Sequence, residues 1–302
     1  MSILSKSYFH NEEDSYKFVE SRVWPDGPVC PRCGGMDRIG ELKGKSTRIG
    51  TYKCYECRKP FTVKVGTIFE SSHIPMHLWL QAIFLISSSK KGISSNQLHR
   101  TLGVTLKSAW FMTHRIREAM KDGNPLPLGG NGGTVEVDET FIGKAKEKNP
   151  KSRGYAHKHK VLSLVERGGR SRSIVVDSLK ASTIVPIIME QVKPDSRIMT
   201  DEANQYQSLH KVFPDHHVVC HSAGEYVRGD VTTNTIEGFF SIFKRGMKGV
   251  YQHCRKNHLN RYLAEFDFRY SNREANGVDD QGRADLVLKG VVGKRLTYKT
   301  AH

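Results

Sequence analysis

The sequence lacks an apolar run long enough to cross a membrane. The longest, LWLQAIFLI at 78–86, is far shorter than the ~20 residues that a transmembrane helix needs. The N-terminal stretch MSILSKSYFHNEEDSYKF has no basic segment followed by an apolar one, so we expect no secretory signal. No internal repeat or low-complexity tract is evident. The 302 residues therefore predict two or three globular domains in the cytoplasm, with no membrane partner.

Acidic residues are scarce relative to basic ones. The chain has 31 Asp and Glu against 47 Lys and Arg, a net charge of +16. Such an excess indicates a polyanionic partner, because clustered cations release counterions from nucleic acid. The excess is concentrated in 77–121, which has one acid, Glu118, and seven cations. They are Lys90, Lys91, Arg100, Lys107, Arg115, Arg117 and Lys121. The alternative is a solvated basic face.

Cysteines are few, and without an export signal they favour metal binding over disulfides. Four of the six form the pairs CPRC at 30–33 and CYEC at 54–57, with twenty residues between them. Two such pairs make a closed tetrahedral shell of four thiolates, which predicts a zinc ribbon with structural Zn²⁺. The predicted ligands are Cys30, Cys33, Cys54 and Cys57. Cys220 and Cys254 lack partners at ligand spacing, so we interpret them as ordinary thiols.

The segment 76–121 has helical periodicity. Its second half predicts two helices joined at Gly103, with Ser94 or Ser95 and Thr105 as N-caps. This is the outline of a helix-turn-helix, in which the second helix would read DNA. The residues expected to face DNA are Lys107, His114, Arg115 and Arg117. Plain helical packing is the alternative.

The rest of the chain predicts an α/β domain. NPLPLGGNGG at 124–133 is typical of a linker. Strand periodicity follows at 134–143, 158–168, 172–180, 196–203 and 216–222, and helical periodicity at 182–192, 205–213 and 234–248. This order favours a mixed sheet flanked by helices. The predicted regions are a zinc-ribbon region 1–65, a helix-turn-helix-like region 66–123, the linker, an α/β domain 134–276 and a tail 277–302.

Two aspartates stand at unusual strand positions. Alternation in TVEVDETFIG puts Glu136 and Asp138 on the face opposite Val137, and Asp201 ends the apolar run of SRIMTDEA. Acids are depleted in strands and costly to bury unpaired, so both positions indicate a compensating cation. Mg²⁺ or Mn²⁺ would meet that need.

Glu237 is the one acid in TTNTIEGFFSIFKRG. If Asn234 or Thr235 caps the predicted helix, Glu237 lies in its first turns and could supply a third oxygen ligand. The alternative is an acid that only complements the helix dipole. Lys244, seven positions later, returns to the same helix face. We predict that Lys244 and the adjoining Arg245 bind DNA phosphates beside the metals.

Several blocks together resemble a known family. VDETFIG, MTDEANQY, HSAGEYVRGDVTTNTIEGFFSIFKRGMKGVYQH and HLNRYLAEFDFRYSNR resemble bacterial insertion-sequence DDE transposases that have an N-terminal zinc ribbon. The resemblance implies an RNase H-like catalytic domain whose acidic triad is Asp138, Asp201 and Glu237. It also implies Mg²⁺-dependent cleavage at transposon ends and joining of the 3′-OH to target DNA.

Neighbouring polar residues have open roles. Glu139 and Glu202 should point away from the site, and Glu136 is either a supporting group or, by preference, a solvated strand residue. Asn234 either belongs to the site or is only an N-cap. His221 either touches the scissile phosphate or is a buried histidine with its hydrogen bonds satisfied.

The predicted function is therefore a transposase that binds terminal inverted repeats and target DNA, as a homo-oligomer when it pairs two ends. One alternative is a DNA-binding regulator whose C-terminal domain is only a scaffold. Another is a structure-selective nuclease on the same fold that cannot join strands.

Overall fold

The computed structural model describes residues 2–123, 125–144, 155 and 157–297. Its contacts divide the chain into unit 1, Met1–Lys121 with Val278–His302, and unit 2, Asp122–Gly277. The C-terminal segment thus belongs to the same unit as the N-terminal region. Across these described residues, we find no helix with the length and apolarity needed to span a bilayer.

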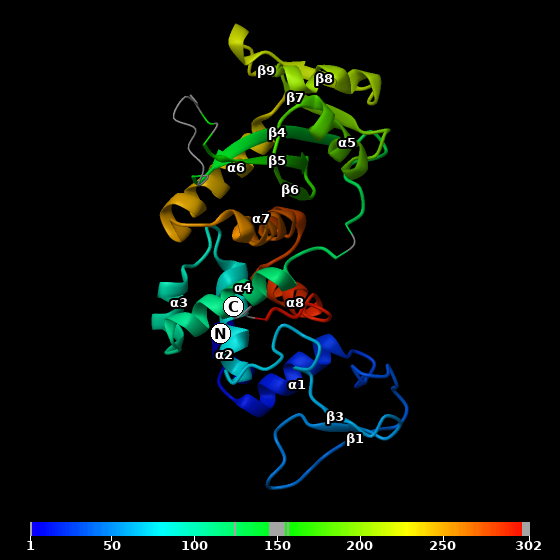
Figure 1. Cartoon of the computed structure of the whole chain (residues 1–302), viewed down its shortest axis with the longest axis vertical. Coiled ribbons are helices and arrows are strands. Elements are labelled where there is room, and N and C mark those ends of the chain that lie inside the picture. The colour runs from blue at the N-terminus through cyan, green and yellow to red at the C-terminus, as the bar shows by residue number, and fades with distance from the viewer. Residues whose placement is uncertain (1, 124, 145–154, 156, 298–302) are drawn as a thin grey trace. The chain divides into compact units, whose positions relative to one another are not determined.

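Helices build most of unit 1 around the apolar helix α2 (Figure 1). They are the short 3-10 helices η1 (Ile3–Ser5) and η2 (Ser7–Phe9), with α1 (Glu12–Val23), α2 (Met76–Ser88), α3 (Ser95–Leu102), α4 (Leu106–Ala119) and α8 (Asp280–Lys289). α2 buries Trp79 and Ile83 and packs against α1, α4 and α8. The Glu12 carboxylate accepts the backbone N–H groups of Met76 and His77 at 2.7 and 3.2 Å, so α1 caps α2.

The helix pair α3–α4 has the predicted local structure. Ser94 Oγ accepts the N–H of Gln97 and Thr105 Oγ1 accepts the N–H of Ser108, so both are N-caps. Gly103 ends α3 in the left-handed conformation at φ 66°, where a β-carbon is disfavoured. The predicted helix, turn and helix are confirmed.

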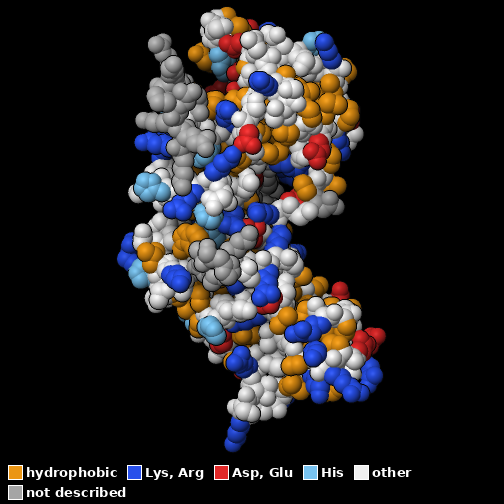
Figure 2. Space-filling model, viewed as in Figure 1, with side chains coloured by type: hydrophobic (Ala, Val, Ile, Leu, Met, Phe, Trp, Pro, Cys, Tyr) orange, Lys and Arg blue, Asp and Glu red, His pale blue; other side chains and the backbone are white. Residues whose placement is uncertain are grey.

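The ribbon is a small antiparallel sheet in the order β1 (Ile39–Glu41), β2 (Tyr52–Cys54), β3 (Pro60–Phe61). Trp24, Tyr52 and Phe61 pack beside the cysteines in a small apolar cluster. Figure 2 shows Lys and Arg side chains gathered over this lobe. The exposed cations of the ribbon are Arg32, Arg38, Lys43, Lys45, Arg48, Arg58 and Lys59.

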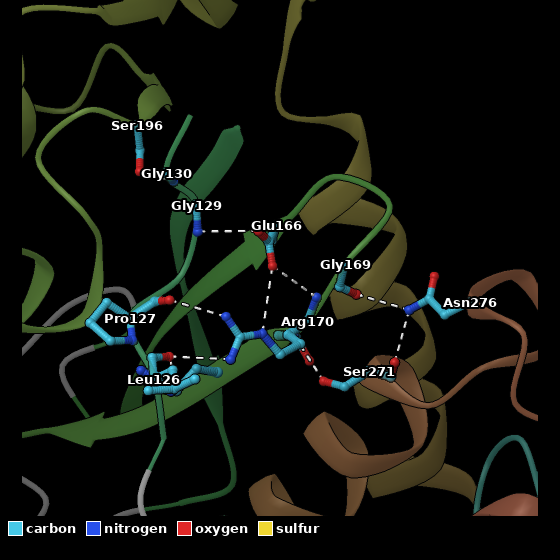
Figure 3. Close-up of polar contacts among 12 residues, drawn as sticks. Leu126, Pro127, Gly129, Gly130, Glu166, Gly169, Arg170, Ser196, Ser271 and Asn276 are labelled. Carbon is cyan, nitrogen blue, oxygen red and sulfur yellow. Dashed lines mark hydrogen bonds and ion pairs between the residues drawn. The ribbon is translucent and has the colours of Figure 1, made fainter. Parts of the chain in front are cut away.

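Much of the segment predicted as a linker is fixed to unit 2 (Figure 3). The Arg170 guanidinium donates to the carbonyls of Leu126 and Pro127 at 3.3 and 3.0 Å. The backbone N–H of Gly129 donates to Glu166, and Leu128 is fully buried in the core. Residue 124 lies outside the described residues. Composition predicted a linker, but 126–130 is bound to unit 2, and Gly129, Gly130 and Gly132 have the left-handed conformations that its bends require.

Unit 2 is built on a five-stranded mixed sheet in the order β6-β5-β4-β7-β8. The strands are β4 (Thr134–Ile142), β5 (His159–Glu166), β6 (Ser171–Val176), β7 (Arg197–Asp201) and β8 (His216–Val219). β5 runs antiparallel to β4 and β6, whereas β7 runs parallel to β4 and β8. This meander followed by parallel strands is the predicted RNase H-like mixed sheet.

Helices cover both faces of the sheet (Figure 1). On one face Val135 and Val137 pack with α5 (Ala181–Gln191) and the 3-10 helix η3 (Asn204–Lys211). On the other face Ile142 packs with α6 (Asn234–Gly246) and α7 (Lys256–Ser271). Alternation along β4 therefore puts Asp138 on the face that α6 and α7 cover.

The connection from β8 to α6 includes elements that the periodicity did not predict. They are the 3-10 helix η4 (His221–Ala223) and the hairpin β9 (Val227–Arg228) with β10 (Val231–Thr232). A π-helical turn, η5 (Met247–Tyr251), continues α6, and the 3-10 helix η6 (Glu274–Asn276) follows α7. The predicted strand 216–222 is shorter than expected because its end turns into η4.

Candidate active site and metal centre

Asp138 and Asp201 lie level with one another on neighbouring parallel strands. β4 and β7 pair Thr134 with Arg197 and Glu136 with Met199, a constant offset of 63 residues. Continuing this offset sets Asp138 beside Asp201, on strands that are about 4.8 Å apart where they pair. Asp201 is the last residue of β7. Asp138, in the middle of β4, is therefore set beside the carboxyl end of β7.

Glu136 fixes the start of α6 against the sheet. Its side chain is fully buried, and one carboxylate oxygen accepts the backbone N–H of Ile236 at 2.9 Å. The other accepts from Arg167 Nε at 2.7 Å. The prediction of a solvated strand residue is therefore wrong, because α6 covers this face. Glu237, the residue after Ile236, is held near the acids of the sheet by this anchor.

Glu237 lies in the first turn of α6 with its carboxylate oriented by two neighbours. Thr233 Oγ1 donates to Oε1 at 3.1 Å, and His221 Nε2 lies 4.0 Å from the same oxygen. The side chain is 47% exposed. Thr233 occupies the N-cap position, so the predicted caps Asn234 and Thr235 are wrong. The predicted place of Glu237 in the helix is confirmed.

The three acids share one electrostatic environment. The pKa of Asp138 is raised to about 8 by burial, then by the charge of Glu139, and also by the charges of Asp201 and Glu237. A backbone N–H of Glu139 donates to Asp138 Oδ1 at 2.7 Å and opposes the shift. A cation beside Asp138 would oppose the effect of these negative charges on its pKa. Carboxylate oxygens are the type of ligand that a hard divalent ion such as Mg²⁺ prefers.

The adjoining glutamates contact other groups, as predicted. Glu139 accepts from Tyr206 Oη at 2.6 Å and Gln205 Nε2 at 2.9 Å, on the α5 face of the sheet. Glu202 accepts the backbone N–H groups of His221 and Ser222. Backbone N–H groups, its own first, lower the pKa of Glu202 to about 2. Glu202 therefore holds η4 in place.

His221 and Asn234 both lie at the edge of the acidic site. His221 Nε2 is buried and, within the described chain, makes no hydrogen bond, which contradicts a fully satisfied histidine. Asn234 is exposed as the first residue of α6, and its backbone N–H donates to Thr232 Oγ1. The geometry brings both beside Glu237 without assigning either a role in chemistry.

The four predicted cysteines come together in unit 1. Sγ of Cys30 lies 3.6 Å from Sγ of Cys57, and Sγ of Cys33 lies 3.6 Å from Sγ of Cys54. All four sulfurs are within 4.8 Å of one another. Tetrahedral Zn²⁺ with bonds of about 2.3 Å sets its sulfurs about 3.8 Å apart, so the cluster fits zinc. Among the described residues no other group of three or more His, Cys, Asp or Glu is gathered as tightly, the carboxylates included.

Comparison with known families agrees with both centres. Residues 130–271 match the ISXO2-like transposase domain, and residues 10–60 match the transposase zinc-ribbon domain. A transposase-like protein of Haemophilus influenzae is 31% identical over 102 residues, 34% of this chain and 81% of that protein. The chain belongs to the ISXO2-like transposase family. The predicted membership among insertion-sequence transposases with a zinc ribbon is confirmed.

Two further similarities extend over more of the chain. A protein in the transposable element ISH50 of Halobacterium salinarum is 27% identical over 278 residues, 86% of this chain and 91% of that protein. Among solved structures, a chain in the complex of the simian T-cell lymphotropic virus intasome with PP2A regulatory subunit B56 gamma has a TM-score of 0.29. Its sequence is 14% identical over 56% of this chain and 63% of that chain, so this chain spans less than two thirds of its length.

The two cations predicted on α6 of this transposase are exposed. The Lys244 ammonium lies 5.6 Å from the centre of the Phe240 ring, and Arg245 donates to Ser241 Oγ. Both side chains are on the helix that provides Glu237.

The prediction that Arg115 and Arg117 read DNA from α4 is wrong. Arg115 and Arg117 are 4% and 1% exposed, and His114 is 1% exposed. The Arg115 guanidinium donates to the carbonyls of Ile68 and Glu70 at 2.6 and 2.8 Å. From residue 112 onward α4 is enclosed by other parts of the chain, which helical spacing alone does not reveal. Lys107, near the exposed start of α4, remains a DNA-binding candidate.

Arg167 is a residue of this site that the sequence did not indicate. Besides pairing with Glu136, it donates to the carbonyls of Asp230 and Thr232, both at 2.8 Å. It thereby ties β5 to the hairpin and to the start of α6. The only available signal was Glu136 itself, because a buried acid on a strand requires a cation.

Proposed function

We propose that this transposase cleaves DNA at the terminal inverted repeats of its element and joins the freed 3′-OH to target DNA. What supports the proposal is that the β4–β7 register sets Asp138 beside Asp201, and that, besides burial, the charges of Asp201 and Glu237 raise the pKa of Asp138. Family membership adds the reaction class.

Each part of the site would contribute differently to the reaction. Asp138, Asp201 and Glu237 would hold two Mg²⁺ ions. When bound, such ions would stabilise the charge on the attacking and leaving oxygens of an in-line displacement. Glu136 and Arg167 keep α6 in position, and Thr233 orients the Glu237 carboxylate.

Basic surfaces in both units would bind the DNA. The exposed cations of the ribbon (Figure 2) and Lys107 would contact terminal repeats, while Lys244 and Arg245 would contact phosphates near the acids. Pairing two transposon ends requires two acidic sites, so we propose a homo-oligomer during that step.

The test is a cleavage and strand-transfer assay on the element's own end DNA with Mg²⁺. Asp138→Asn should lower cleavage to below about one hundredth while DNA binding stays nearly unchanged, because mainly metal coordination is lost. Asp177→Asn is the matched control, since Asp177 is an exposed acid of unit 2 paired with Lys256. It should cleave normally.

Three outcomes would contradict parts of the proposal. Wild-type protein that binds its end DNA yet never cuts would support the regulator interpretation. Cutting without joining would support a nuclease. Equal activity of Asp138→Asn and wild type would remove Asp138 from the site.

A further inference from the structure

An exposed apolar pair stands out on the hairpin between β8 and α6. Tyr226 and Val227 are 58% and 53% exposed. Among the large hydrophobic side chains exposed in the described chain, they are the only two adjacent in sequence. The exposed tyrosine ring and valine leave apolar area in water, which is unfavourable. A ligand that covers this area would therefore be favoured.

Tyr226 lies one side chain away from Glu237. The ring centre of Tyr226 is 5.0 Å from that of His221, with 35° between the ring planes. On its other side, His221 Nε2 is 4.0 Å from Oε1 of Glu237. A strand whose phosphate reaches Glu237 would therefore bring its next base to Tyr226.

The hairpin is held firmly, so the exposure of the pair is built into the fold. Arg228 pairs with Val231 across the hairpin and donates to the carbonyl of Val218 at 3.0 Å. Arg197 pairs with the Asp230 carboxylate, and Arg167 donates to the Asp230 carbonyl. A surface that is fixed before binding loses little conformational entropy when it takes a ligand.

We propose that the exposed Tyr226 ring is a platform on which an unpaired nucleobase next to the cleaved phosphate stacks. The inference rests on the proposed function, since the acidic site must receive DNA. Bases in a duplex are hidden in the stack, so enzymes that act there extrude them at a cost of a few kcal/mol. Stacking on an aromatic ring offsets that cost and tolerates any base.

The test combines protein and DNA changes in one binding experiment. Full-length protein carrying Asp138→Asn, which prevents cutting, is titrated with fluorescent end duplexes in Ca²⁺. One duplex is intact, and the others lack one base at each position around the cleavage site. Tyr226→Ala should weaken binding of the intact duplex by about 5- to 100-fold, the range for one stacked base.

The pattern across duplexes identifies the occupant. At one or two positions beside the cleavage site, removing the base should abolish the effect of Tyr226→Ala, because the stacking partner is already gone. Tyr226→Phe, which keeps the ring, should bind like the tyrosine. Met189→Ala is the control, an apolar side chain on α5 that is 50% exposed; it should change nothing.

Other outcomes would overturn the platform. An effect of Tyr226→Ala that is equal for all duplexes, or absent, excludes base stacking. A loss of oligomer mass together with such an equal effect would assign the pair to a second copy of the chain. Failure of protein with native Tyr226 to bind end DNA would instead defeat the proposed function itself.

Discussion

Two acids on one face of β4 have different environments and hence different tasks. Glu136 is surrounded by donors, Arg167 Nε and the N–H of Ile236. Asp138 receives one backbone N–H and otherwise lies near like charges, which together with burial raise its pKa to about 8. Glu136 is therefore suited to hold the fold together, and Asp138 is suited to bind a cation.

Glu136 gives a prediction about stability. Glu136→Ala should lower the free energy of unfolding of unit 2 by about 3 kcal/mol, because Arg167 would lose its buried partner. Glu136→Gln should cost less, since its carbonyl can still accept the N–H of Ile236. Denaturant titration of both variants measures the difference. If both variants lose the same free energy of unfolding, the hydrogen bond from the backbone N–H of Ile236 does not contribute to stability.

His216 gives a prediction about pH. Burial, followed by the charges of His210 and His217, lowers the pKa of His216 to about 4. Its neutral form accordingly contributes stability above pH 6.5 that is lost as pH falls towards 4. Over this range His216→Gln should make the fall in unfolding free energy shallower by up to about 1.4 kcal/mol per pH unit.

The comparison is made by urea unfolding at several pH values between 6.5 and 4. His253→Gln, at an exposed position of unit 2, is the control and should keep the wild-type slope. If the free energy of unfolding of His216→Gln changes with pH as steeply as that of the wild type, another group causes the loss of stability at acidic pH.

At the scale of elements, α4 divides into two parts with opposite environments. Its start, with Leu106 45% exposed and Lys107 also exposed, follows the Thr105 cap and faces solvent. Its second half is enclosed, and the Arg115 guanidinium donates a hydrogen bond to the backbone carbonyl of Ile68. In a helix-turn-helix the first residues of the second helix contact DNA, so burial of the later turns is compatible with that motif.

This division predicts different effects of two cation replacements in α4. In a plot of the logarithm of the DNA-binding constant against the logarithm of salt concentration, Lys107→Ala should reduce the magnitude of the slope by about 1. It should have little effect on the stability of unit 1. Arg115→Ala should destabilise unit 1, because three backbone carbonyls lose a charged donor. Salt-dependent binding curves and thermal unfolding separate the two. Loss of stability in Lys107→Ala would contradict the assignment.

At the scale of the whole molecule, the ribbon of unit 1 and the sheet of unit 2 are stabilised by different means. The ribbon has a small apolar cluster beside four cysteines, whereas unit 2 has large clusters on both faces of its sheet. A small core with a bound metal ion depends on that ion, because the free energy of zinc binding contributes directly to the free energy of folding. Unit 2 does not share this dependence.

Loss of zinc should therefore unfold the ribbon selectively. In Cys54→Ser, or after zinc chelation, backbone amides of 30–61 should lose protection from hydrogen exchange, while those of β4 and β5 keep theirs. Binding of end DNA should weaken in parallel. Unchanged binding by Cys54→Ser would count against recognition through the ribbon.

Local signals predicted much of this architecture. Ser94, Thr105 and Gly103 act within a few residues of themselves, so their roles follow from residue type and position. The cysteine pairs needed only their spacing. Predictions failed where the decisive partner was remote: Glu136 meets Ile236 one hundred residues away, and Arg115 meets Ile68 and Leu296.

By itself the sequence determined the cysteine cluster of the ribbon, the order of the five sheet strands with α5 and α6, and which acids share a side of β4, because periodicity and spacing are properties of neighbouring residues. Tertiary structure alone decided which charges stay accessible. Burial arises when segments far apart in the chain pack together, and that packing enclosed Arg117, gave Glu136 its partners and left Tyr226 in solvent beside His221.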